Sequence, residues 1–340
     1  MKTYISIIVL AFSPILSAAS LFYTAVNLGN PNTDLSDTIT LTDINNSGTV
    51  TGYSLHGANS STKGIVWNNG SVTILNNLGG IFTNTSTRAY SVNNSGQVVG
   101  SYTSPSLPGV NRSFVLQNNI GADLLTTGIG PSNGSIAYSI NDSGVVVGGG
   151  SVNLGGNFYL ENGITISLPH LSNDTRAQAN DINNNNITVG KSYGSGTISA
   201  VMWQNGTISS LGLTGSYSES FAINDDGQII GMSSNGGFLW KDGVTAYFPD
   251  YDMRDINNLG QIIAGNRIYD NGTFKDIEIV SDLDPTGGVF YPRVINDQGQ
   301  IAGIGSNGNV FLLTPTTIPE PSQIMILLIF SIVFITRRKK

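Results

Sequence analysis

The chain has no cysteine, two histidines and few charged side chains. Charged residues make up 11% of its 340 residues, and the two histidines are His56 and His170. Without cysteine, disulfides and thiolate metal sites are excluded, so the fold must be held by apolar burial and backbone pairing. A Ser-His-Asp triad would have to use one of these two histidines.

The charge balance is acidic, with 22 acidic and 15 basic residues. Nucleic-acid affinity comes from phosphate neutralisation, so this balance argues against nucleic acid as a partner. Glycine is abundant at 42 residues, and asparagine, serine and threonine are frequent. Such polarity without charge favours turns and solvated strand faces over long helices, and it predicts an all-β fold.

The first 20 residues have the pattern of a secretory signal peptide. Lys2 supplies a positive charge, an apolar run extends over 5–16, and small residues follow, with cleavage expected near Ala19 or Ser20. The apolar run is shorter than the roughly 20 residues that a membrane-spanning helix needs. We therefore expect signal peptidase to remove it and the rest of the chain to be exported.

The last residues form a second address signal. Pro319-Glu320-Pro321 precedes an apolar run over 324–336, predicted as a short transmembrane helix, and a basic tail of Arg337, Arg338, Lys339 and Lys340. Thirteen helical residues reach only about 20 Å, against a hydrocarbon core of about 30 Å. The four terminal cations resist translocation and are expected to stay cytoplasmic. An ordinary tail anchor is the alternative interpretation of this segment.

This order of motif, helix and cations resembles the PEP-CTERM sorting signal of Gram-negative bacteria. The resemblance covers the last 23 residues, and the motif residues are Pro319, Glu320 and Pro321. It implies an exosortase that processes the protein near the motif. The expected location is the cell envelope, the surface or the extracellular space, with anchoring to the membrane through the C-terminus.

One short phrase recurs seven times between the two ends. An apolar residue precedes Asn-Asn/Asp-x-Gly, and β-branched residues follow, as expected for a tight turn between two strands. In the fourth copy Asn186 stands where glycine is expected, and asparagine also tolerates the left-handed region. The first and fourth residues of the seven turns are Asn45 and Gly48, Asn93 and Gly96, Asn141 and Gly144, Asn183 and Asn186, Asn224 and Gly227, Asn257 and Gly260, and Asn296 and Gly299.

A second phrase follows most copies: an apolar run and then Asn-Gly or Asp-Gly, which is a strong hairpin signal. Each repeat therefore predicts four strands. The spacing between copies averages about 42 residues, a period typical of propeller blades. The last copy contains only three strands, and the segment 22–29 supplies the missing one. The sequence predicts an all-β, seven-bladed β-propeller over 21–316 whose last blade is closed by the N-terminal strand, with the sorting segment over 317–340.

These phrases resemble the HAF repeat of bacterial extracellular proteins over most of 22–315. The resemblance implies a surface location and a repeat architecture, and no chemistry. Trp67, Trp203 and Trp240 stand at the tryptophan of the family's second phrase. We expect them to form core between the blades; a sugar-stacking platform is the alternative.

No catalytic constellation stands out. Gly190-Lys191-Ser192-Tyr193-Gly194 matches G-x-S-x-G but lacks the following helix of a nucleophile elbow. Five acids could form a glycosidase-like pair, although a solvated acidic rim is the simpler interpretation. They are Asp250, Asp252, Asp255, Asp282 and Asp284.

Calcium is the one metal that the pattern suggests. The oxygen spacing Asp43-x-Asn45-x-Ser47-Gly48 resembles the start of an EF-hand loop, with echoes at Asp181 and Asp255. The carboxylate expected at the twelfth position is absent, so the phrase is interpreted as a turn and no cofactor is expected.

The expected function is that of a non-catalytic surface or matrix protein. Its propeller would serve as a scaffold for exopolysaccharide or envelope proteins. The alternative is an enzyme that acts on extracellular glycans from an acidic face of the propeller.

Overall fold

The computed structural model describes residues 21–31, 38–55, 61–103, 109–124, 134–150, 157–194, 196–279 and 288–316. In these ranges the chain forms 28 β-strands and two short 3-10 helices, η1 (Leu75–Leu78) and η2 (Gly80–Phe82). No helix of this described part is long and apolar enough to cross a membrane. The predicted signal peptide (1–20) and sorting segment (317–340, with its helix at 324–336) lie outside the described residues. The all-β prediction is confirmed.

Five sheets have four antiparallel strands each, in sequence order from the inner to the outer strand. The first contains β2 (Thr38–Ile44), β3 (Val50–Leu55), β4 (Thr62–Asn68) and β5 (Ser71–Ile74). The second contains β6 (Thr87–Val92), β7 (Val98–Thr103), β8 (Asn111–Gln117) and β9 (Ile120–Asp123). The third contains β10 (Ser135–Ile140), β11 (Val146–Gly150), β12 (Asn157–Glu161) and β13 (Ile164–Leu168). The fourth contains β14 (Arg176–Ile182), β15 (Thr188–Tyr193), β16 (Ile198–Gln204) and β17 (Thr207–Ser210). The fifth contains β18 (Ser218–Ile223), β19 (Ile229–Ser233), β20 (Gly236–Lys241) and β21 (Val244–Phe248).

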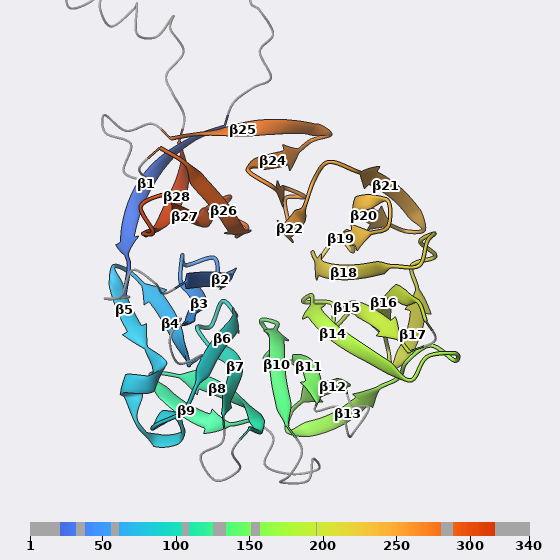
Figure 1. Cartoon of the computed structure of the whole chain (residues 1–340), viewed down its shortest axis with the longest axis horizontal. Helices are drawn as coiled ribbons and strands as arrows, with labels where there is room; N and C mark the ends of the chain where they lie inside the picture. Colours follow the sequence, from blue (N-terminus) through green and yellow to red (C-terminus); the bar gives the residue numbers. More distant parts are fainter. Residues whose placement is uncertain are drawn as a thin grey trace, which may run out of the picture.

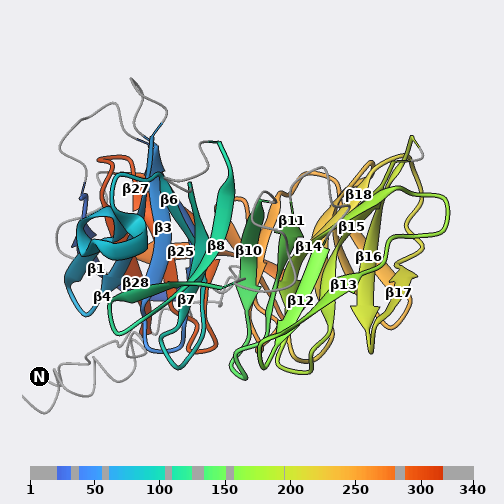
Figure 2. The ribbon, with the colours of Figure 1, turned by 90° about the horizontal axis from the view of Figure 1, so that it is seen from below.

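The remaining strands form one eight-stranded sheet in the order β22-β23-β24-β25-β1-β28-β27-β26. Its first half is β22 (Met253–Ile256), β23 (Ile262–Ala264), β24 (Arg267–Asp270) and β25 (Thr273–Ile279). Its second half is β26 (Phe290–Ile295), β27 (Ile301–Gly305), β28 (Val310–Thr316) and β1 (Leu21–Gly29). Figure 1 shows all the sheets arranged around a central axis, with the first strand of each repeat nearest to it. Seen from the side in Figure 2, strands of the sheets run between the two faces of the molecule.

The N-terminal strand completes the last three-stranded repeat, as the sequence predicts. β1 pairs antiparallel with β28, from Phe22 opposite Thr316 to Gly29 opposite Val310. The sequence did not predict that β1 also pairs in parallel with β25, through Leu21 and Ile277 to Tyr23 and Ile279. This second pairing covers the edge of β25, whose backbone groups would otherwise lack partners. The two ends of the described chain therefore lie side by side.

A β-bulge interrupts the inner strand of every repeat. The register between the first two strands shifts by one residue at the same place each time, for example between Leu41 and Asp43. A glycine of the second strand lies against this bulge in six repeats. At Gly100 an added Cβ would lie 2.0 Å from the carbonyl oxygen of Arg88. The recurring glycine after the β-branched residues thus accommodates the close approach of the bulged backbone in six repeats, and Ala264 stands at this position in the repeat of β22 and β23.

Apolar side chains fill the spaces between neighbouring sheets. Large, fully buried residues of the third strands, such as Trp67, Trp203, Phe114 and Phe158, contribute most of the volume. One cluster joins Ile44, Val50 and Trp67 of the first sheet to residues of β26–β28, so the last repeat packs directly on the first. Apolar burial therefore continues around the whole ring of sheets.

Candidate functional site

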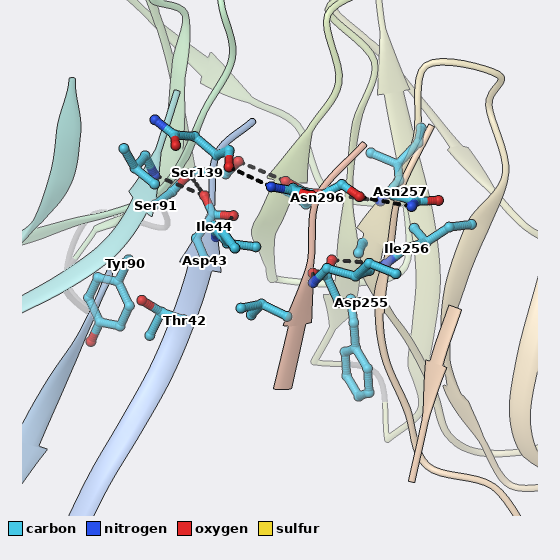
Figure 3. Close-up of a pocket in the computed structure, with 18 of the residues that line it drawn as sticks. Thr42, Asp43, Ile44, Tyr90, Ser91, Ser139, Asp255, Ile256, Asn257 and Asn296 are labelled. Atoms are coloured by element: carbon cyan, nitrogen blue, oxygen red, sulfur yellow. Dashed lines mark hydrogen bonds between the residues drawn. The ribbon is translucent and has the colours of Figure 1, made fainter. Parts of the chain in front are cut away.

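A channel lies on the central axis of the described structure. It has a volume of about 680 Å³ and is lined by the inner strand and the following turn of every repeat. Seven sets of equivalent residues line it, and the close-up in Figure 3 shows part of this wall. Because the turns repeat, the lining residues form successive levels along the channel.

The first level is a closed ring of seven asparagines. The side-chain Nδ2 of each donates to the backbone carbonyl oxygen of the next, at 2.9–3.1 Å, and each side chain is only 3–4% exposed. We call it the asparagine ring; the bond from Asn296 is drawn in Figure 3. Its bonds run from Asn45 to Asn93, Asn141, Asn183, Asn224, Asn257, Asn296 and back to Asn45.

The same asparagines also build their own turns. In every copy the Oδ1 atom accepts the backbone N–H four residues later at 2.9 Å, as Asn183 does from Ile187. The fourth residue of each turn has a positive φ, which is 78° at Gly48 and 60° at Asn186. The position therefore needs a short side chain that accepts the N–H of its own turn and donates to the carbonyl oxygen of the next repeat. Among the natural residues, asparagine supplies both groups at this length.

The second level, at one mouth of the channel, is a rim formed by the residues that follow the asparagine ring. Each rim backbone N–H donates to the side-chain Oδ1 of the next rim residue at 2.7–2.9 Å, and these seven bonds also close a circle. In order the rim residues are Asn46, Asn94, Asp142, Asn184, Asp225, Asn258 and Asp297.

Asparagine and aspartate alternate around this rim except at the neighbours Asn46 and Asn94. Each aspartate consequently lies between two asparagines, and its Oδ2 accepts from both amide groups at 2.8–3.3 Å. Adjacent carboxylates would repel each other, whereas this order gives every carboxylate two amide donors.

The third level, on the other side of the asparagine ring, contains three carboxylates, Asp43, Asp181 and Asp255. Each accepts the N–H of the residue after it and a second N–H from the neighbouring repeat, as Asp255 does from Ile256 at 2.9 Å and from Ile295 at 2.7 Å. Asp43 and Asp181 also accept serine hydroxyls, from Ser91 and Ser139, at 2.7 Å. These carboxylates therefore join adjacent sheets.

Burial is the main influence on the protonation of these three acids. It raises the pKa of Asp181 to about 6, partly offset by the hydrogen bonds from Ser139 and Ile223. The pKa values of Asp43 and Asp255 are raised for the same first reason, and the charges of the other acids at this level add to the effect on Asp255. The channel wall thus holds carboxyl groups that take up protons more readily than exposed ones.

The fourth level is made by the bulge residues, whose chemical character changes from one part of the circle to another. Tyr90 and Tyr138 meet edge to face at a centroid distance of 5.5 Å, and Tyr53 continues the contact from Tyr90 at 6.1 Å. In Figure 3 Tyr90 and Thr42 lie together on the channel wall. The seven bulge residues are Thr42, Tyr90, Tyr138, Asn180, Phe221, Arg254 and Arg293.

Comparisons with known proteins give no relative by sequence. No protein-family model matches the chain, and no curated protein matches it. Among solved structures, TolB from Acinetobacter baumannii aligns over 84% of this chain at 10% identity and a TM-score of 0.39. An arginine-to-alanine triple mutant of AofleA from Arthrobotrys oligospora aligns over 87% of this chain and 91% of its own, at 12% identity and a TM-score of 0.35. This chain spans 56% of the TolB structure.

The structure separates the acids that the sequence grouped as one rim. Asp255 belongs to the channel wall, where backbone N–H groups hold it, whereas Asp250 is exposed. Asp252 forms an ion pair with Arg254 at 2.8 Å. Asp282 and Asp284 lie outside the described residues. The bulge at Arg254 explains the separation, because it changes the face on which the following residue lies.

The other candidate residues have structural environments. Ser192 of the G-x-S-x-G string is fully buried inside β15 and donates to the carbonyl oxygen of Arg176. His170 is exposed and contacts the backbone of Leu171, while His56 lies outside the described residues. Trp67 and Trp203 are 1% exposed, so for these two the core interpretation is confirmed and a sugar platform is not.

The calcium pattern is not gathered into one set of ligands. The Asp43 carboxylate accepts hydrogen bonds from the neighbouring repeat. Asn45 Oδ1 instead accepts the backbone N–H groups of Ser47 and Thr49 in its own turn. Within the described ranges no three histidine or acidic side chains are close enough to share a metal ion.

Sequence reasoning identified the seven asparagines as turn residues and missed their bonds to one another. The available signal was that asparagine occupies this position seven times out of seven, although a turn alone accepts several residues there.

We predict that Asn183→Asp strongly destabilises the protein. The carboxylate cannot donate to the carbonyl oxygen of Asn224 and places a charge against it, which costs at least roughly 1–3 kcal/mol in the free energy of unfolding. The matched control is Asn162→Asp in an exposed hairpin turn, where the equivalent residue of a later repeat is Asp242. Denaturant unfolding measures both variants. Equal midpoints for the two would show that the asparagine ring contributes nothing to stability.

We predict that Asp181 makes stability depend on pH. A carboxyl group whose folded-state pKa is raised to about 6 binds protons more tightly in the folded protein, so its contribution is complete only below its unfolded-state pKa of about 4 and is lost as the pH rises through 6. The stability of the wild type relative to Asp181→Asn should therefore fall between pH 4 and 7. Thermal melting at several pH values measures the difference, and parallel curves for the two proteins would contradict the prediction.

Proposed function

We propose that the chain is a seven-bladed β-propeller that serves at the cell surface as a non-catalytic scaffold for polysaccharide or an envelope partner. In this proposal the eight-stranded sheet counts as two blades joined through β1 and β25. The ligand would enter the central channel at the bulge level, opposite the rim. The HAF-like repeats and the two terminal address signals support an exported location.

The observation that carries the proposal is that three acids of the channel wall are held by backbone hydrogen bonds, whereas the bulge residues face the open channel. The carboxylates of Asp43, Asp181 and Asp255 accept backbone N–H groups that join neighbouring sheets. A general acid or base needs a carboxyl group that is free to reach a substrate, and these groups are occupied. The tyrosines and arginines of the bulge level instead line open channel volume, as binding groups do.

Binding and cleavage can be measured together with the full-length protein and an extracellular polysaccharide. We expect co-sedimentation with the polysaccharide and no release of reducing ends. Tyr90→Ala should weaken binding several-fold, because an aromatic contact contributes roughly 0.5–1.5 kcal/mol. Tyr247→Ala is the control, since Tyr247 is 37% exposed on the outer strand β21. If the protein does not co-sediment with the polysaccharide, the scaffold is refuted. If the wild type releases reducing ends and Asp252→Asn does not, the enzyme is favoured.

The sorting proposal predicts processing of the C-terminus. In a host with exosortase the mature protein should lack Lys340, because cleavage is expected near Pro319-Glu320-Pro321. In an isogenic host without exosortase Lys340 should remain. Mass spectrometry of the C-terminal peptide measures both, and retention of Lys340 in both hosts would reduce the segment to a tail anchor.

A further inference from the structure

Two arginines of the bulge level occupy equivalent positions in neighbouring repeats. Arg254 stands at the bulge of β22 and Arg293 at the bulge of β26, and both line the channel. The repeats are adjacent, since Asp255 accepts the N–H of Ile295 and Asn257 donates to Asn296. Partial burial and, after it, the charge of Arg254 lower the pKa of Arg293, and the charge of Asp252 offsets part of this effect. Two like charges therefore lie near each other on the partly exposed wall of the channel.

Neither arginine is fully satisfied by the protein. Arg254 uses one terminal nitrogen for Asp252, but its Nε is buried and has no hydrogen-bond partner. Arg293 makes no hydrogen bond or ion pair with any residue of the described chain. The adjacent Asp255 carboxylate is occupied by backbone N–H groups and does not pair with either guanidinium. Asp252 lines the same wall and supplies an acceptor to Arg254, whereas Arg293 has none in the described chain, so the pair favours a further acceptor beside Arg293.

Other groups of the same level indicate what carries that acceptor. Tyr90 and Tyr138 line the channel, and their hydroxyl groups have no hydrogen-bond partner in the described part of the chain. Aromatic faces with free hydroxyl groups suit a sugar ring, while the fork of a guanidinium suits a planar carboxylate. The carboxyl groups of Asp43, Asp181 and Asp255 at the next level disfavour a ligand with more negative charge, such as a phosphate dianion.

Resting on the proposed binding function, we propose that the channel contains an anion subsite between Arg254 and Arg293 that takes the carboxylate of an acidic sugar. The sugar is a uronic acid unit of a polysaccharide, and its ring lies toward Tyr90 and Tyr138. Binding offsets the repulsion between the two guanidinium groups and provides an acceptor for Arg293, which has none in the described chain. Neutral polysaccharides lack this group and bind more weakly.

The test uses the full-length protein with tetragalacturonate as the acidic probe and maltotetraose as the neutral probe of the same length. Isothermal titration should give tighter binding of tetragalacturonate, weakened by added salt. Arg293→Gln and Arg254→Gln should each weaken it by about tenfold or more, because a charge-assisted hydrogen bond is lost. Arg176→Gln is the matched control, since Arg176 is exposed on the inner strand β14, does not line the channel and changes the charge equally.

A second measurement separates a binding role from a structural one. Without ligand at low salt, Arg293→Gln should melt at the same or a higher temperature than the wild type, because one of two repelling charges is removed. Unchanged tetragalacturonate affinity in Arg293→Gln, or a lower melting temperature without ligand, would overturn the anion subsite. If the wild type binds polysaccharide or maltotetraose but not tetragalacturonate, the subsite is refuted and the proposed function stands. If it retains no glycan at all, both fail.

Discussion

The asparagine ring is the interaction on which the rest of this structure depends. Every member accepts a hydrogen bond from its own turn and donates one to the next repeat, so local turn geometry and contact between sheets share one side chain. Because the last bond returns from Asn296 to Asn45, residues 251 positions apart in sequence are coupled directly. The pairing of β1 with β28 closes the same circle at the outer edge. Inner and outer closure therefore support each other.

The acidic residues follow from this constraint. At the rim, alternation with asparagine gives each of Asp142, Asp225 and Asp297 two amide donors, and an odd number of repeats leaves one pair of neighbouring asparagines. At the level of Asp43 the acids are separated by serine, alanine or valine in other repeats. Carboxylates are thus used as acceptors that connect sheets, in a chain that has no disulfide to do so.

Much of the fold was predictable, because its determinants lie within a few residues of each other. Asparagine and glycine at fixed offsets define each turn, and the last repeat, which has only three strands of its own, indicated where β1 belongs. The channel was not predictable in the same way. The partner of Asn183 is 41 residues away, and which residues line the wall depends on a bulge that hydrophobic alternation does not reveal. For this reason Asp250, Asp252 and Asp255 looked like one acidic group, although Asp255 has a different environment.

Variation among the seven repeats separates the residues that hold the channel from those to which the proposed binding function assigns specificity. The ring position is asparagine in all seven copies, since another residue would lose the hydrogen bond within its own turn, the one to the next repeat, or both. The bulge position, only three residues earlier, changes from threonine through tyrosine, asparagine and phenylalanine to arginine. Nothing in the hydrogen bonding of the ring requires those side chains, so their identity is free to match a ligand. In the proposed binding function, the uneven circle, aromatic at Tyr90 and Tyr138 and cationic at Arg254 and Arg293, would therefore favour one orientation of an asymmetric ligand over binding along a uniform pore.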